Sequence, residues 1–245
     1  MKPALLFVFA FLTFLSCNKI NFADYRKSPG IDLRFCNIRT WSDIHGDEQR
    51  TNIFTYDDHE NPVSVTSNHS GTGSGHHFFT YDDQQRLIKY EYQFVQTSVY
   101  HYEGTSRRAK EAAITDAYGR ELLETYTYDD KGRIIKSELT LVSSPFEDEE
   151  FPPVTKEYVY LNDDISSILL NGQQQNPDVT YSDKPSVYMT NKVWQFVNQN
   201  YSKHSVAHVA QTNSIGLPVA FESDQYEFPF LDITGAGSTL TYDCK

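Results

Sequence analysis

The sequence predicts an all-β protein: an antiparallel meander of β-hairpin repeats that forms either a large twisted sheet or a partly closed barrel. Three observations predict this fold class. Tyrosine–aspartate segments recur along the chain, aromatic and polar residues alternate before them, and no amphipathic helical pattern rises above background. A length of 245 residues suits one large all-β domain. We expect about 12–16 strands, and sheets of that width usually curl.

The N-terminal segment carries a short apolar stretch. Lys2 precedes twelve mostly apolar residues, Ala4–Leu15, which are followed by Ser16 and Cys17. Spanning a bilayer needs about 20 residues, so this stretch fits the apolar core of a secretory signal peptide instead. The segment resembles a bacterial lipoprotein signal, in which cleavage occurs before the cysteine. An ordinary secreted protein with a chance cysteine is the alternative.

The lipoprotein resemblance implies a location and a domain plan. Acyl chains such as palmitate on Cys17 would anchor the protein in the outer membrane of a Gram-negative cell, on its periplasmic or cell-surface face. Residues 1–16 would be the signal peptide and residues 17–30 a polar tether. Residues 31–245 would form a single all-β repeat domain. The membrane is therefore an expected partner, reached through the lipid on Cys17.

Two further cysteines, Cys36 and Cys244, lie near the two ends of the expected domain. Cysteines pair readily in the oxidising compartment outside the inner membrane, and chain termini are often close together. We expect a Cys36–Cys244 disulfide, which would close a loop of about 209 residues and contribute roughly 5 kcal/mol in the chain-entropy model. It requires the strand around 33–41 to lie beside the strand around 238–244. Two buried free thiols are the alternative.

The repeat units share an aromatic–polar–Tyr segment, a turn and a second apolar segment. Alternation places both aromatic rings on one face of a strand, and the aspartates that follow favour a turn because they accept hydrogen bonds from nearby backbone N–H groups. Each unit therefore predicts a β-hairpin. The copies are 54–66, 79–92, 100–112, 126–139, 158–170, 179–190, 209–221 and a final half-unit, 240–245. Their recurring tyrosines are Tyr56, Tyr81, Tyr102, Tyr128, Tyr160, Tyr181 and Tyr242.

The units resemble the YD repeats of the rearrangement-hotspot protein family, whose motif is close to Tyr-Asp-x-x-Gly-Arg-Leu. The best match is Tyr128-Asp129-Asp130-Lys131-Gly132-Arg133-Ile134. The chain as a whole is more similar to lipid-anchored bacterial surface proteins with degenerate repeats. Large members of the YD family enclose a toxin in a shell of many repeats. This chain has too few units for that role, so the resemblance implies the hairpin fold and no toxin function.

Two stretches between the clearest copies need separate interpretation. Residues 107–126 contain helix formers, but Thr115, Asp116 and Gly119 interrupt them and favour a hairpin around 116–119. Residues 143–153 are acidic and contain prolines, which predicts a loop. The repeats resume after this loop, so we expect no domain boundary there.

Candidate chemical groups are few in the sequence. The aspartate pairs 57–58, 82–83, 129–130 and 163–164 lack the alternating oxygen ligands of a calcium loop and fit turns better. His69, His76 and His77 flank a Gly/Ser-rich segment without a further ligand at fixed spacing. Residues 71–75 lack the lysine of a phosphate loop and the elbow of a serine nucleophile. We therefore expect no catalytic, cofactor or metal residues and no enzyme.

The charge balance restricts the partners. Thirty-three acidic and 21 basic side chains give a net charge of −12, which argues against a nucleic-acid partner. The high tyrosine content suggests a surface of aromatic rings that stacks on a glycan or binds a protein. We therefore expect a non-catalytic binding module for an unknown glycan or protein ligand. A glycan-acting hydrolase with two facing carboxylates, and a structural subunit of an outer-membrane complex, are the alternatives.

Overall fold

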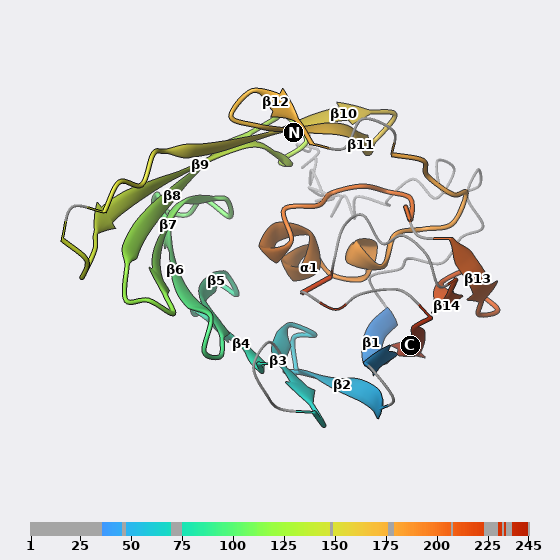
Figure 1. Ribbon diagram of the computed structural model, residues 1–245. Helices are drawn as coiled ribbons and strands as arrows, with labels where there is room; N and C mark the ends of the chain where they lie inside the picture. The colour runs from blue at the N-terminus through green and yellow to red at the C-terminus, as the bar shows by residue number, and fades with distance from the viewer. Residues whose placement is uncertain are drawn as a thin grey trace, which may run out of the picture. The chain divides into compact units, whose positions relative to one another are not determined.

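Fifteen strands form one antiparallel sheet in the part of the chain that the computed structural model describes (Figure 1). Those residues are 36–45, 48–69, 75–147, 149–175, 179–206, 208–222, 230–231, 233 and 237–244. They all belong to a unit that spans Asp32–Lys245, separate from Met1–Ile31. The expected signal peptide, Cys17 and the tether lie outside the described residues.

The elements follow one another in a simple order. The first strands are β1 Cys36–His45, β2 Glu48–Tyr56, β3 Pro62–Ser67, β4 His77–Tyr81, β5 Leu87–Tyr92, β6 Gln96–Tyr102, β7 Ala109–Asp116 and β8 Glu121–Tyr128. The later strands are β9 Ile134–Ser143, β10 Val154–Leu161, β11 Asp164–Leu170, β12 Gln173–Gln174, β13 Val209–Thr212, β14 Pro218–Phe221 and β15 Thr239–Cys244. A 3-10 helix, η3 Val187–Thr190, and a short helix, α1 Lys192–Val197, lie between β12 and β13.

The strand order is β12-β11-β10-β9-β8-β7-β6-β5-β4-β3-β2-β1-β15-β14-β13, so nearly every strand pairs with its neighbour in sequence. The sequence neighbours β12 and β13 do not pair, and β15 pairs with β1 as well as with β14, which joins the last three strands to the start of the meander. The predicted antiparallel meander is confirmed. It stays an open sheet, because β12 and β13 form its two edges. Both edges are short, which limits pairing with other chains.

The hairpin turns explain why the repeat units fold as predicted. In five turns the first residue is Asp57, Asp82, Asp116, Asp129 or Asn213, and its Oδ1 accepts the backbone N–H four residues later at 2.8–3.0 Å. In each turn, the residue immediately before the one that donates this N–H has a φ of 60–88°. Glycine takes this conformation without steric cost, and it does so in three of the five turns. The interpretation of these aspartates as turn residues is confirmed.

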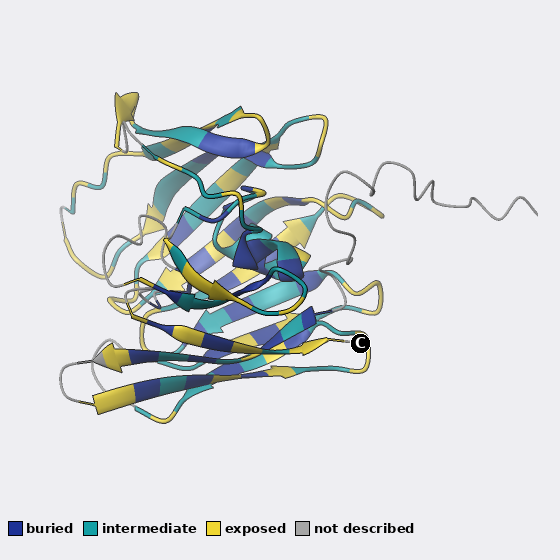
Figure 2. Cartoon of the chain, turned by 90° about the vertical axis from the view of Figure 1, so that its right-hand side faces the viewer, coloured by how far each residue is buried: buried dark blue, intermediate teal, exposed yellow. Residues whose placement is uncertain are grey.

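Burial alternates along the strands, as a sheet with one packed face requires (Figure 2). Phe79 on β4 is buried, Thr80 is exposed, and Tyr81 points to the same face as Phe79. The face with the buried residues, here called the inner face, bends around α1 (Figure 1). The hairpin predicted around residues 116–119 is formed by β7 and β8, and the acidic loop separates β9 from β10.

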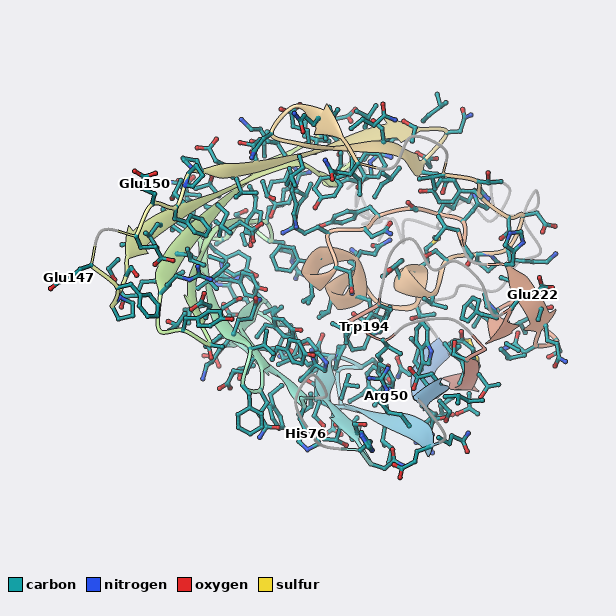
Figure 3. The ribbon with its side chains drawn as sticks, viewed as in Figure 1. Arg50, His76, Glu147, Glu150, Trp194 and Glu222 are labelled. Atoms are coloured by element: carbon teal, nitrogen blue, oxygen red, sulfur yellow. A yellow bond between two sulfur atoms is a disulfide. The ribbon has the colours of Figure 1, made fainter. Side chains whose placement is uncertain are left out.

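The core is richest in aromatic rings where α1 meets the inner face. Trp194 on α1 is fully buried and contacts Phe54, Phe79 and Phe230 with ring centroids 5.3–5.7 Å apart. Figure 3 shows Trp194 between α1 and the sheet, whereas Glu147 and Glu150 lie on the β9–β10 connection, away from α1. None of the helices in the described ranges has the length and apolar character needed to cross a membrane.

The seam between β1 and β15 contains the expected disulfide. Cys36 and Cys244 are directly opposite each other in the antiparallel register and form a disulfide bond. The predicted neighbourhood of the first and last strands is therefore confirmed.

One predicted hairpin is wrong. Residues 179–190 contain no strand pair; they lead into η3 and α1 across the inner face. Pro185 occupies the position at which other units have a residue with positive φ, such as Gly132. A proline ring fixes φ near −65°, so the turn cannot form there.

Candidate functional site

The recurring tyrosines are structural. All seven donate their hydroxyl to a backbone carbonyl oxygen of an earlier strand, at 2.7–3.5 Å. The pairs are Tyr56–Ile38, Tyr81–Pro62, Tyr102–Leu87, Tyr128–Ala109, Tyr160–Ile134, Tyr181–Ile165 and Tyr242–Pro218. We call these bonds the tyrosine clamps. Burial raises the pKa of Tyr102 to about 12, so its hydroxyl stays protonated and able to donate at neutral pH.

Arginines at the turns connect successive units. Arg86 donates from Nε to Asp82 Oδ2 at 2.7 Å, and its guanidinium lies 4.6 Å from the ring centroid of Tyr102 in the next unit. Arg133 repeats this arrangement with Asp129 and Tyr160. Partial burial opposes ionisation of Asp82, but hydrogen bonds from the backbone and side chain of Arg86 outweigh it and lower the pKa of the carboxyl. The charged side chains of these turns therefore pair with one another and stabilise the fold.

The three histidines do not meet at one point. His77 is buried on β4, its Nδ1 lies 2.8 Å from the Tyr90 hydroxyl, and its ring stacks on Tyr92. His76 Nδ1 accepts the backbone N–H of Ser67 at 3.2 Å. His69 lies 3.3 Å from a carboxylate oxygen of Glu48. In the described ranges, no group of three or more His, Cys, Asp or Glu side chains could hold a metal ion.

Asp164 and His204 form a pair that the sequence did not indicate. Asp164 begins β11 instead of sitting in the turn, and it accepts both the backbone N–H and the Nδ1 of His204 at 2.8 Å. Among the hydrogen bonds of the described residues, no hydroxyl contacts the His204 ring. A nearby cleft of about 440 Å³ is lined by Asp164, Ser166 and Tyr181, among others. The pair holds residues 179–206, here called the crossing segment, to β11.

The strongest candidate site is a second cleft, of about 490 Å³, between the inner face and the end of α1. This volume falls within the range of small-molecule sites, roughly 300–1,000 Å³. Six tyrosines line it: Tyr90, Tyr92, Tyr100, Tyr126, Tyr158 and Tyr188. We call it the tyrosine cleft. Most of these rings come from the sheet, so a rigid scaffold positions them.

Polar groups at the tyrosine cleft form a connected network. Glu124 on β8 accepts a hydrogen bond from the Tyr126 hydroxyl at 2.9 Å and from Gln199 Nε2 at 2.8 Å. Gln199 Oε1 accepts from the Tyr158 hydroxyl at 2.7 Å and from Ser137 Oγ at 3.1 Å. Gln199 follows α1 with a φ of 49°, a conformation that is unusual for a residue other than glycine. One amide thus links β8, β9 and β10 to the crossing segment.

Burial, and after it the charge of Glu124, affect the tyrosine hydroxyls of the cleft. Burial raises the pKa values of Tyr100, Tyr126 and Tyr158, and the negative charge of Glu124 raises them further. The three hydroxyls therefore stay protonated at neutral pH, and those of Tyr126 and Tyr158 keep their bonds to Glu124 and Gln199. Lys156 on β10 also lines the cleft and is exposed to solvent.

The sequence suggested aromatic rings for binding but did not identify these residues. Strand alternation places Leu122, Glu124 and Tyr126 on the inner face of β8. A charged residue on a face that is otherwise apolar could have indicated a functional site. Gln199 belongs to no repeat unit, and nothing in the local sequence places it beside Glu124.

Comparison with known proteins adds no assignment to this geometry. Neither a protein-family model nor a curated protein matches the chain. The function must therefore be inferred from the site itself.

Proposed function

We propose that this protein is a non-catalytic binding module of the cell envelope, anchored by lipid at Cys17, and that the tyrosine cleft binds a saccharide. The observation that carries the binding site is the combination of six tyrosines with a carboxylate and an amide around one cleft of small-ligand size. The anchoring rests on the lipoprotein-like signal in residues 1–17. The resemblance of the repeats to YD repeats is part of the same proposal.

The lining suits a sugar ring for two physical reasons. A tyrosine ring offers a flat apolar face for the C–H face of a sugar and a hydroxyl for polar contact. Glu124, Gln199 and Asn198 supply acceptors and donors for the sugar hydroxyls. An extended peptide would gain most from an open strand edge, and the cleft offers none, since β5 to β10 are paired on both sides.

The lining favours binding over glycan hydrolysis. Hydrolases of this kind use two carboxyl groups about 5–9 Å apart. Glu124 is the one carboxylate among the described residues that line the tyrosine cleft. Glu124 also accepts two hydrogen bonds from neutral donors, which suits a fixed acceptor better than a group that must exchange a proton.

Binding is tested on the full chain, purified in a non-ionic detergent, with an array of neutral, acidic and amine-bearing glycans. We expect at least one glycan to bind with a dissociation constant that calorimetry can measure. Tyr126→Leu removes a ring from the cleft and should weaken binding about tenfold, because stacking and hydrogen bonding together contribute 1–2 kcal/mol.

Tyr118→Leu is the matched control for this experiment, because Tyr118 lies in the β7–β8 turn, outside the lining of the cleft, and is 66% exposed. It should bind as the wild type does, and both variants should keep the wild-type circular dichroism spectrum. Absence of binding to every glycan, or equal binding by wild type and Tyr126→Leu, would refute the proposal.

Anchoring is tested by labelling cells with an alkyne analogue of palmitate. The label should appear on the wild-type chain and be absent from Cys17→Ala, which should also leave the membrane fraction. A wild-type protein that is recovered from the medium without an acyl group would show that the chain is secreted.

A further inference from the structure

The carboxylate of Glu124 can accept more hydrogen bonds than the described residues donate to it. Its two oxygens each accept one hydrogen bond, from Tyr126 and from Gln199. A carboxylate oxygen can accept two, so each oxygen retains one acceptor position. Both present donors are neutral, and neither offsets the negative charge.

Glu124 also differs from the other charged groups on the inner face. Asp43 is buried and forms a bidentate pair with Arg50. Asp164 is paired with His204. No Lys, Arg or His nitrogen of the described residues lies within 4 Å of the Glu124 carboxylate, although Lys156 lines the same cleft.

A half-buried carboxylate surrounded by aromatic rings favours a cation. The faces of tyrosine rings attract a positive charge through their quadrupole, and an ammonium group can donate a charge-assisted hydrogen bond to a carboxylate. The negative charge of Glu124 already acts on the hydroxyls of Tyr100, Tyr126 and Tyr158, so its field extends across the cleft. Neutral donors alone would leave this field uncompensated.

We infer that the tyrosine cleft selects amine-bearing saccharides, and that the ammonium group of the ligand binds at Glu124 between the rings of Tyr100, Tyr126 and Tyr158. This inference rests on the proposed function and names the class of ligand. The sugar ring would stack on tyrosine, while the ammonium group would take the open acceptor positions of Glu124. An N-acetylated sugar of the same size keeps the ring but loses the charge.

The test compares two probes of equal length: oligomers of β-1,4-linked glucosamine and of N-acetylglucosamine. Calorimetry on the full chain in non-ionic detergent, at a mildly acidic pH at which the amino groups of the glucosamine oligomer are protonated, should show at least tenfold tighter binding of this oligomer. Glu124→Gln keeps the shape and removes the charge, so the variant should bind the two probes within about twofold of each other.

Lys156→Glu provides a second readout that does not disturb the network. Lys156 is exposed and forms no ion pair among the described residues, so the variant should fold normally. A second carboxylate at the cleft should increase affinity for the glucosamine oligomer about threefold or more. Lys192→Glu is the matched control, because Lys192 is exposed on α1 outside the cleft lining and changes the net charge equally.

The outcomes separate this inference from the proposed function. Equal binding of the two probes by the wild type, or a preference for the acetylated probe, would overturn the selection of amines while leaving saccharide binding in place. A preference that persists in Glu124→Gln, or an equal gain in Lys192→Glu, would also overturn it. Absence of binding to these probes and to every arrayed glycan would refute both.

Discussion

The meander of hairpins and the segment that crosses its inner face are built in opposite ways. Strands β2 to β9 are set by local rules: a tyrosine, an aspartate turn and a return strand, repeated with small changes. Residues 179–206 begin with the same signal, and Tyr181 still makes its clamp to Ile165. Beyond Pro185 the segment follows no repeat and is held by tertiary contacts, chiefly Trp194 and Gln199.

In this repetitive sheet, the proposed binding site arises where the repeats are interrupted. The repeats use their tyrosines, aspartates and arginines to bind one another. The tyrosine cleft forms only where the non-repetitive segment meets the inner face. Substitutions in the two regions should therefore differ in their effect on stability.

Removal of the Cys36–Cys244 disulfide should have the largest effect on stability. The bond spans 208 residues and joins the first strand of the meander to the last strand of the chain. Cys36→Ser combined with Cys244→Ser should lower the free energy of unfolding by about 5 kcal/mol, because the unfolded chain gains loop entropy. Urea unfolding of the double variant and the oxidised wild type measures this. Equal midpoints would show that the seam depends on strand pairing alone.

Trp194→Ala should detach the crossing segment from the meander. Trp194 is fully buried among Phe54, Phe79 and Phe230, and truncation of such a residue costs about 3–5 kcal/mol. We expect the backbone amides of residues 191–206 to lose their protection signal in hydrogen exchange, with the strand signal of the far-ultraviolet dichroism retained. Loss of both signals together would mean that the meander does not fold without the segment.

Acid should destabilise the meander through His77. Burial lowers its pKa from 6.5 to about 4, so the unfolded chain binds the proton first. Its contribution is complete above pH 6.5 and is lost as the pH falls towards 4, by roughly 3 kcal/mol. The slope of unfolding free energy against pH between 4 and 6.5 should be smaller in His77→Phe. Parallel slopes would assign the acid sensitivity to other groups.

Loss of a single tyrosine clamp should cost about 1 kcal/mol in either region. Tyr102→Phe removes the bond to Leu87 in the meander, and Tyr181→Phe removes the bond to Ile165 at the start of the crossing segment. Similar losses of unfolding free energy, measured by thermal unfolding, would show that the clamp stabilises a repeat unit whether or not that unit forms a hairpin. A loss confined to Tyr102→Phe would limit it to the meander.

Exchanges at the positive-φ position should have the smallest effects. Gln85 and Gly132 occupy equivalent turn positions with φ of 60° and 82°. Gln85→Gly should stabilise the protein by about 0.5 kcal/mol, and Gly132→Gln should destabilise it by about 1 kcal/mol, because only glycine takes this conformation without steric cost. Denaturation midpoints measure both. Shifts in the same direction would contradict the equivalence of the two turns.

The meander could be predicted from local sequence patterns, because strand alternation and aspartate turns act over a few residues and repeat. The pairing of β1 with β15 could also be predicted, since a disulfide between the two cysteines near the domain ends was expected and would bring these strands together. The missing hairpin at residues 179–190 could also have been predicted, because the fixed φ of Pro185 is incompatible with the turn of the other units. The position of α1 and the contact between Glu124 and Gln199, which are 75 residues apart, became visible in the folded chain alone. Such contacts depend on how an irregular segment packs against a curved sheet, and no local pattern encodes that packing.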